Sequence, residues 1–453
     1  MSSKSHEMDL CSGSLWKKIF VYSVPLMFTN ILQVLFNMSD VAVVGKFAGA
    51  IALGAVGSTS ILVTLFTGIL LGLASGVNAL TALHIGSKDD EGLKRTVHTA
   101  VIICLAGGIL ITVFGILFSH NILALMNTKD ELIDGAVLYL RIYLLGMPAL
   151  GVYNFGNAVL SAAGDTKRPL YYLAFAGVVN VILNLFFVIV CHLGVAGVAL
   201  ASMISQFISA FLILRALLTG KEKYCLRLSE IRFDKRKAVG ILQIGIPSAF
   251  QYSLFAFANL FVQSSVNSFD HVLVEGNSAA ANADPLVYDM MAAFYTACSS
   301  FIAQNFGARK KKRILQTYLI CLFYSFITSL VLGVGIYLAR YPFLYLFTSD
   351  KAVVEAGITR LSIMALSYSA SAFMDASIAA SRGLGKTAVP TFVVVMGSCV
   401  FRIIWIYTIF AYFHTIQSLY ILYVFSWGIT AIAENIYFFH VYRHTLTEKK
   451  ELC

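Results

Sequence analysis

The stretch IFVYSVPLMFTNILQVLFNMSDVAVVG, residues 19–45, decides the class of fold because it is long, apolar and carries one charge, Asp40. A helix needs about 20 such residues to cross a bilayer. An acid within the hydrocarbon core costs about 2.5–3.5 kcal/mol on insertion scales, so acids in such positions usually have a function. Asn30, Gln33 and Asn37 fall at helical spacing with Asp40 and form one polar stripe. The stripe predicts a helix that lines a wet pathway or binds a polar ligand, with amide packing between helices as the alternative.

The same apolar character runs through the whole chain. Hydrophobic residues make up 58% of the sequence and charged residues 12%, whereas soluble domains are near a quarter charged. We expect an all-α polytopic membrane protein with twelve spans. The predicted spans are 19–44, 51–83, 96–118, 133–158, 169–191, 194–218, 238–268, 278–305, 314–339, 353–380, 388–412 and 416–442.

The basic residues predict the orientation of these spans. With the N-terminus in the cytoplasm, most lysines and arginines fall on the cytoplasmic side, notably in Lys221–Lys237 and Arg309–Arg313. An even number of spans returns the C-terminus to the same side, so both termini are predicted to be cytoplasmic. The net charge of +10 is therefore a topology signal. It gives little support to a nucleic-acid partner, and runs such as Arg309–Arg313 are compatible with contact to anionic lipid head groups.

The chain repeats itself once, with a constant offset between three landmarks. The paired landmarks are Pro25 and Pro247 (222 positions apart), Gly86 and Gly307 (221), and Pro169 and Pro390 (221). Each repeat contains six predicted spans, so both repeats have the same orientation. We expect two six-helix lobes, residues 1–218 and 238–453, joined by a cytoplasmic linker, 219–237, and related by a pseudo-two-fold axis along the membrane normal.

Polar residues of the first lobe converge at one depth in the membrane. Asp40, Asn184 and Ser202 lie at similar distances from the outer ends of spans one, five and six, and Asn180 precedes Asn184 by one helical turn. A carboxylate, two amides and a hydroxyl form an oxygen-rich set. The set predicts a site for a monovalent cation, with protonation of Asp40 as the competing use.

The sequence is similar to the multidrug and toxic compound extrusion (MATE) transporters over about residues 15–445. The resemblance is carried by the two sixfold halves, His84-Ile-Gly-Ser-Lys88, Ser161-Ala-Ala-Gly-Asp-Thr166, Asn180-x3-Asn184 and Gly194-Val-Ala-Gly-Val-Ala-Leu-Ala-Ser202. It implies that Asp40, Asn180, Asn184 and Ser202 form the coupling-ion site of the N-terminal lobe. It also implies that Asp375, before Arg382-Gly383, is the aspartate of span ten.

Two positions depart from the pattern of the family. Phe255 stands where one branch has a glutamate in span seven, and Asn184 stands where proton-coupled archaeal-type members have an aspartate. The first departure weakens a cation site in the C-terminal lobe, and the second favours Na+ over H+, with Asp40, Asn180 and Asn184 as Na+ ligands.

Other residues within the spans are candidates for the substrate pathway or for helix packing. Gln33, Asn37, Asp289 and Asp375 are the candidates for the pathway. Asp289 and Arg402 are also predicted to form a buried structural pair, since both lie near mid-depth. Gly68-x3-Gly72-x3-Gly76 on span two predicts a close-packing face.

Together these features predict an antiporter of the cell membrane, coupled to Na+ or H+, that exports amphipathic, mostly cationic drugs or toxic metabolites by alternating access. We expect a monomer with no cofactor besides the coupling ion. One alternative is a flippase for lipid-linked precursors of the same superfamily. Another is an integral membrane enzyme, but the sequence contains no catalytic or phosphate-binding motif, so we expect no enzymatic activity.

Overall fold

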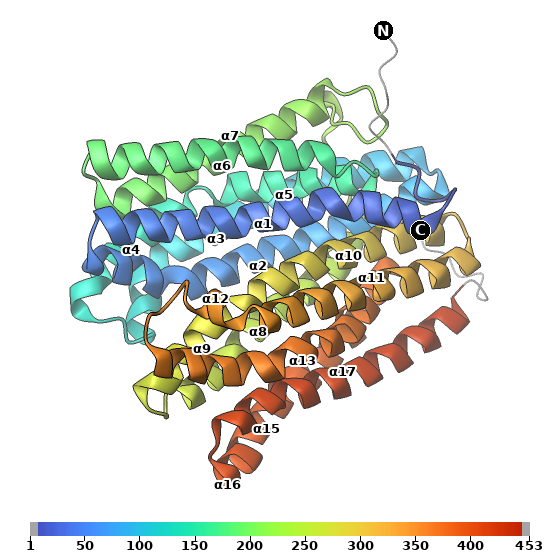
Figure 1. Ribbon diagram of the computed structural model, residues 1–453. Coiled ribbons are helices and arrows are strands. Elements are labelled where there is room, and N and C mark those ends of the chain that lie inside the picture. The colour runs from blue at the N-terminus through green and yellow to red at the C-terminus, as the bar shows by residue number, and fades with distance from the viewer. Residues whose placement is uncertain (1–7, 446–453) are drawn as a thin grey trace. The chain divides into compact units, whose positions relative to one another are not determined.

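The computed structural model describes residues 8–445, which form helices and contain no strand (Figure 1). The helices are α1 (Leu15–Phe47), α2 (Ala50–Ser87), α3 (Asp90–Leu125), α4 (Asp130–Leu144), α5 (Met147–Ala162), α6 (Lys167–Leu185), α7 (Gly194–Thr219), α8 (Lys235–Val266), α9 (His271–Ala281), α10 (Ala283–Gly307), α11 (Lys311–Leu338), α12 (Arg340–Leu344), α13 (Lys351–Gly383), α14 (Ala388–Val394), α15 (Phe401–Trp405), α16 (Ala411–Phe413) and α17 (Ile416–His444). Short π-helical segments, Phe186–Val190, Val395–Val400 and Ile406–Phe410, continue α6, α14 and α15.

The helices of the described region are long and apolar enough for a multi-pass membrane protein. Eleven of them could each cross a bilayer, and the number rises to twelve if the bent pair α4 and α5 is one span. Their outer faces fit this environment: on α3, Leu110, Phe114 and Leu117 are 69, 50 and 66% exposed. The predicted all-helical polytopic fold is therefore confirmed.

Two of the predicted spans are interrupted. The predicted span 133–158 is a bent one, because α4 ends at Leu144 and α5 begins at Met147 at an angle of 45°. Pro148 lies in the first turn of α5, where its missing N–H and fixed φ are tolerated, but it cannot continue a preceding helix. The predicted span 278–305 is likewise divided at Asn282 between α9 and α10, and Pro285 lies in the first turn of α10.

By packing, the helices form two compact units. Among the described residues, the first unit contains Met8, Asp9 and Phe28–Tyr252, and the second contains Leu10–Met27 and residues 253–445. The first and last parts of α1, and likewise of α8, therefore belong to different units. The lobe boundaries read from the sequence, 218 and 238, stay a prediction.

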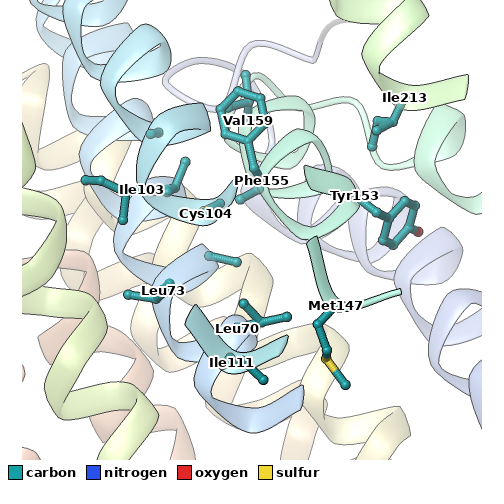
Figure 2. Packing of buried hydrophobic residues seen from close by; sticks show 14 of the residues in the cluster. Leu70, Leu73, Ile103, Cys104, Ile111, Met147, Tyr153, Phe155, Val159 and Ile213 are labelled. Atoms are coloured by element: carbon teal, nitrogen blue, oxygen red, sulfur yellow. The ribbon is translucent and has the colours of Figure 1, made fainter. Parts of the chain in front are cut away.

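In the first unit, apolar side chains of α2, α3, α5 and α7 form the main core. Leu70 of α2, Cys104 of α3 and Phe155 of α5 are at most 1% exposed, and Figure 2 shows them between their helices. Because lipid tails are as apolar as leucine, close van der Waals packing rather than removal from water holds such helices together.

Glycines of α2 allow close approach of the α8 backbone in this unit. A Cβ at Gly72 would lie 2.3 Å from the backbone nitrogen of Ala249 on α8, and one at Gly76 would lie 2.3 Å from the carbonyl oxygen of Ile241. Only glycine fits at these distances. The predicted close-packing face is confirmed.

The segment between α7 and α8 packs on the first turns of α3. Lys94 forms an ion pair with Glu230, and the backbone nitrogen of Arg227 donates to Nε2 of His98 at 3.1 Å. Asp89 caps α3 by accepting from the backbone nitrogen of Gly92 at 2.9 Å, and this hydrogen bond lowers the pKa of Asp89. The predicted linker is thus anchored to the first unit.

In the second unit, α13 is the central helix. It packs against α9, α10, α11 and α17, and α13 and α17 run side by side in Figure 1. The N-cap Asp350 starts α13 by accepting from the backbone nitrogen of Ala352 at 2.8 Å.

Candidate functional site

Asp40, near the C-terminal end of α1, is held by two other helices of the first unit. The side-chain nitrogen of Asn184 on α6 donates to Oδ1 of Asp40 at 2.5 Å. The hydroxyl of Ser202 on α7 donates to Oδ2 at 2.8 Å. Both carboxyl oxygens are therefore hydrogen-bonded, each by a different helix, and the convergence predicted from depth is confirmed.

Asn180 closes the arrangement. Its Oδ1 accepts from Nδ2 of Asn184 at 3.2 Å, and its own Nδ2 donates to Oγ of Ser202 at 3.4 Å. The spacing of four residues places Asn180 and Asn184 on one face of α6. Asn180, Asn184 and Ser202 are 4, 0 and 5% exposed. We call these four residues the Asp40 cluster.

One oxygen atom of the Asp40 cluster is available to a ligand. Oδ1 of Asn184 is buried and has no hydrogen-bond partner among the described residues. Such a carbonyl oxygen carries a cost that a ligand would remove. Together with the carboxyl of Asp40, it offers oxygen ligands to a cation, and the carboxyl alone can bind a proton. Within residues 8–445 no group of three or more His, Cys, Asp or Glu side chains could hold a metal ion.

The hydrogen-bonding pattern of the α6 backbone changes next to the Asp40 cluster. Directly after Asn184, α6 passes into the π-helical segment Phe186–Val190. Single π-helical turns within α-helices occur frequently at functional sites.

Two tyrosines of α4 belong to the surroundings of Asp40 and were not predicted. Tyr139 and Tyr143 both interact electrostatically with Asp40, and their rings stack with centroids 5.8 Å apart. Their spacing of four residues was a visible signal, but two aromatic residues on an apolar span usually indicate packing alone.

The four candidates for the substrate pathway do not join the Asp40 cluster. Gln33 and Asn37 are exposed side chains of α1. Asp375 and Asp289 lie on α13 and α10 of the second unit and are partly buried. Asp375 interacts electrostatically with Arg382 and with Glu434. A role in the pathway stays a prediction for all four.

The predicted pair of Asp289 and Arg402 is wrong. Arg402 donates to Asn259 and Ser426 and, among the described residues, to no carboxylate. The buried Arg360 of the second unit instead forms an ion pair with the half-buried Asp284, at 2.5 Å. Depth alone could not identify it, because depth says nothing about the direction in which a side chain leaves its helix.

Comparisons with known proteins agree on one family. The model of the MatE family matches the chain twice, over residues 25–186 and 247–408, which confirms the internal repeat. The chain is 31% identical over 307 residues to a "Probable multidrug resistance protein YpnP" of Bacillus subtilis, with 68% of each chain covered. It is 28% identical over 364 residues to a "Probable multidrug resistance protein YoeA" of the same organism, with 78% of each covered.

Solved structures share the fold. The structure of a MOP superfamily transporter from Pyrococcus furiosus superposes with a TM-score of 0.91 at 22% identity, over 99% of this chain and 100% of that one.

Proposed function

Since this chain belongs to the MatE family, we propose that it is a multidrug efflux transporter of the cell membrane, coupled to Na+ or H+ through Asp40. The relatives in Bacillus subtilis, named as probable multidrug resistance proteins, support the export of drugs. We further propose that the substrates are amphipathic small molecules, mostly cationic, and that a monomer in contact with membrane lipid carries out transport. Neither a lipid-linked-precursor flippase nor a membrane enzyme is favoured by membership of this family.

The observation that carries the coupling proposal is the hydrogen-bonded acid within a membrane span. The Asp40 carboxyl is bound by side chains of α6 and α7, and the neighbouring Oδ1 of Asn184 has no partner among the described residues. A cation bound by the Asp40 carboxyl and by Oδ1 of Asn184 would add contacts between α1 and α6 to the hydrogen bonds already present. The ion would thereby favour one arrangement of the three helices.

Coupling requires that ion and substrate favour different conformations. A ligand shifts an equilibrium only by the difference between its affinities for the two states. In the proposed cycle, the ion favours the arrangement in which the Asp40 cluster is closed and the substrate favours the other. The two ligands then exchange across the membrane by alternating access between the lobes.

The test is transport in proteoliposomes under separately imposed Na+ and H+ gradients. The wild-type protein is expected to move ethidium under one of the two gradients. Asp40→Asn keeps the shape of the side chain but removes its charge, and transport should fall to background. Asp134→Asn makes the same change on an exposed residue of α4 and serves as the matched control. Wild-type transport by a normally folded Asp40→Asn variant would refute the proposal.

The proposed orientation, with both termini in the cytoplasm, has its own test. Ser229 is exposed in the segment between α7 and α8, and Lys129 is exposed before α4. In a variant whose exposed Cys191 is replaced by serine, a membrane-impermeant thiol reagent should label Lys129→Cys from outside intact cells but leave Ser229→Cys unlabelled. The opposite pattern would invert the topology.

A further inference from the structure

The internal repeat allows the Asp40 cluster to be compared with its counterpart in the second repeat. Pro247 lies 222 positions after Pro25, and the same offset takes Asp40 to Val262. It also takes Asn37, one turn before Asp40, to Asn259. The acid of the first repeat is therefore an apolar residue in the second, and Val262 is 4% exposed.

The other two helices of the cluster also have counterparts. Tyr423 of α17 lies 221 positions after Ser202, and Arg402 of α15 lies 222 positions after Asn180. The landmark Pro390 lies only 221 positions after Pro169. The stretch from Pro390 to Arg402 is therefore one residue longer than the stretch from Pro169 to Asn180. The π-helical segment Val395–Val400 lies in this longer stretch and explains the extra residue, because its hydrogen bonds span five residues instead of four.

The structure joins these counterparts by direct contacts. Nη1 of Arg402 donates to Oδ1 of Asn259 at 2.9 Å, and Nε donates to Oγ of Ser426, one turn after Tyr423, at 3.3 Å. The guanidinium carbon lies 4.5 Å from the ring centroid of Tyr423 and 6.0 Å from that of Trp427. We call these five residues the Arg402 cluster.

The ligands around the Arg402 guanidinium are those of a bound cation. They are an amide oxygen, a hydroxyl oxygen and two aromatic faces, which attract cations more strongly when water is excluded. Arg402 is 1% exposed, and its hydrogen-bond acceptors among residues 8–445 are neutral. A charge in such a position is costly unless its surroundings replace water.

We propose that the Arg402 cluster is a cation site whose cation is covalently attached. The guanidinium occupies, between α8, α15 and α17, the place that corresponds to the free-cation site between α1, α6 and α7. The site itself would accept guanidinium or a small alkylguanidinium if the arginine side chain were absent.

This inference deepens the proposed function and rests on it in one respect. If Asp40 binds the coupling ion, the Asp40 cluster changes its charge during transport and the Arg402 cluster does not. The guanidinium stays between α8, α15 and α17 throughout the cycle, because the arginine cannot leave or lose its proton.

The test is chemical rescue of Arg402→Ala in the purified full-length chain. Removal of the side chain leaves a void lined by cation ligands, so Tm should fall by about 5 °C. Guanidinium or methylguanidinium chloride at millimolar concentration should restore a saturable part of the loss, as a ligand of the folded state does. Sodium chloride at the same concentration should not, and the wild-type protein should not respond to either salt.

Phe438→Ala is the matched control, because Phe438 is a fully buried residue of α17. It should lose stability without any response to guanidinium. If Arg402→Ala folds only when guanidinium is present during purification, the proposal is equally supported. The proposal is overturned if Arg402→Ala is recovered folded but its Tm does not respond to guanidinium. It is also overturned if the variant cannot be recovered folded even when guanidinium is present. Neither measurement involves transport, so this inference and the role of Asp40 can fail separately.

Discussion

The Asp40 cluster and the Arg402 cluster occupy corresponding places in the two repeats but carry opposite charges. In the first, an acid accepts from an amide and a hydroxyl. In the second, a guanidinium donates to an amide and a hydroxyl. The Asp40 cluster is neutral only when it binds a cation, whereas the Arg402 cluster already contains one. Under the proposed function, the duplicated scaffold combines one cluster that responds to an ion with one that does not.

The largest effect is expected when the attached cation is moved into the first repeat. Asn180→Arg places a guanidinium at the position that corresponds to Arg402, next to the acid Asp40. The pair would neutralise the site permanently, so coupled transport should fall at least about a hundredfold, a loss of roughly 2.7 kcal/mol. The response of Tm to the coupling ion should disappear.

Asn180→Met separates charge from size in this experiment, because methionine is long but neutral. It should retain measurable transport and an ion response. If Asn180→Met is as inactive as Asn180→Arg, the side-chain volume is responsible, and the comparison of the two clusters loses this support.

The sequence predicts the Asp40 cluster well for a physical reason. Helix rise is constant, so distances from the span ends place Asp40, Asn184 and Ser202 at one depth. Each of the three is also a polar residue on an otherwise apolar helix, so few other polar side chains are available as its partners. The apolar stretches predict the spans equally well, except that the fourth is bent before Pro148 and the eighth is divided at Asn282.

Side-chain direction could not be predicted in the same way. Gln33 and Asn37 share a predicted stripe with Asp40 but are exposed. Asp289 and Arg402 share a depth but are not paired. The direction of a side chain depends on the rotation of its helix about the helix axis. The π-helical segment before Arg402 shifts that rotation by one residue, and the composition carries no signal of it.

A smaller effect distinguishes the ions at the Asp40 cluster. Asn184→Ala removes the unpartnered Oδ1 without changing the charge of Asp40. If Na+ is bound, its apparent affinity should fall roughly tenfold, as for the loss of supporting groups at other metal sites. We expect this result because position 184 has an amide instead of a second acid.

Uptake at varied Na+ concentration and varied pH measures this difference. Ile406→Ala is the control, since Ile406 lies 222 positions after Asn184 in the second repeat and should leave ion affinity unchanged. A moved pH profile with no dependence on Na+, or full wild-type activity in sodium-free buffer under a pH gradient, would assign the site to H+.

The smallest effect comes from one substitution made in both clusters. Ser426→Ala removes the acceptor of Nε of Arg402. The loss should cost about 1 kcal/mol, or roughly 1 °C in Tm for a chain of this length, with no change in the concentration of ion that gives half-maximal transport. Ser202→Ala removes a donor to Asp40 and should cost a similar amount of stability, but it should also weaken the ion response severalfold. Thermal unfolding and ion titration of both variants measure the two quantities side by side. A change in ion affinity for Ser426→Ala equal to that for Ser202→Ala would mean that both repeats respond to the ion, and the distinction between a free and an attached cation would then be wrong.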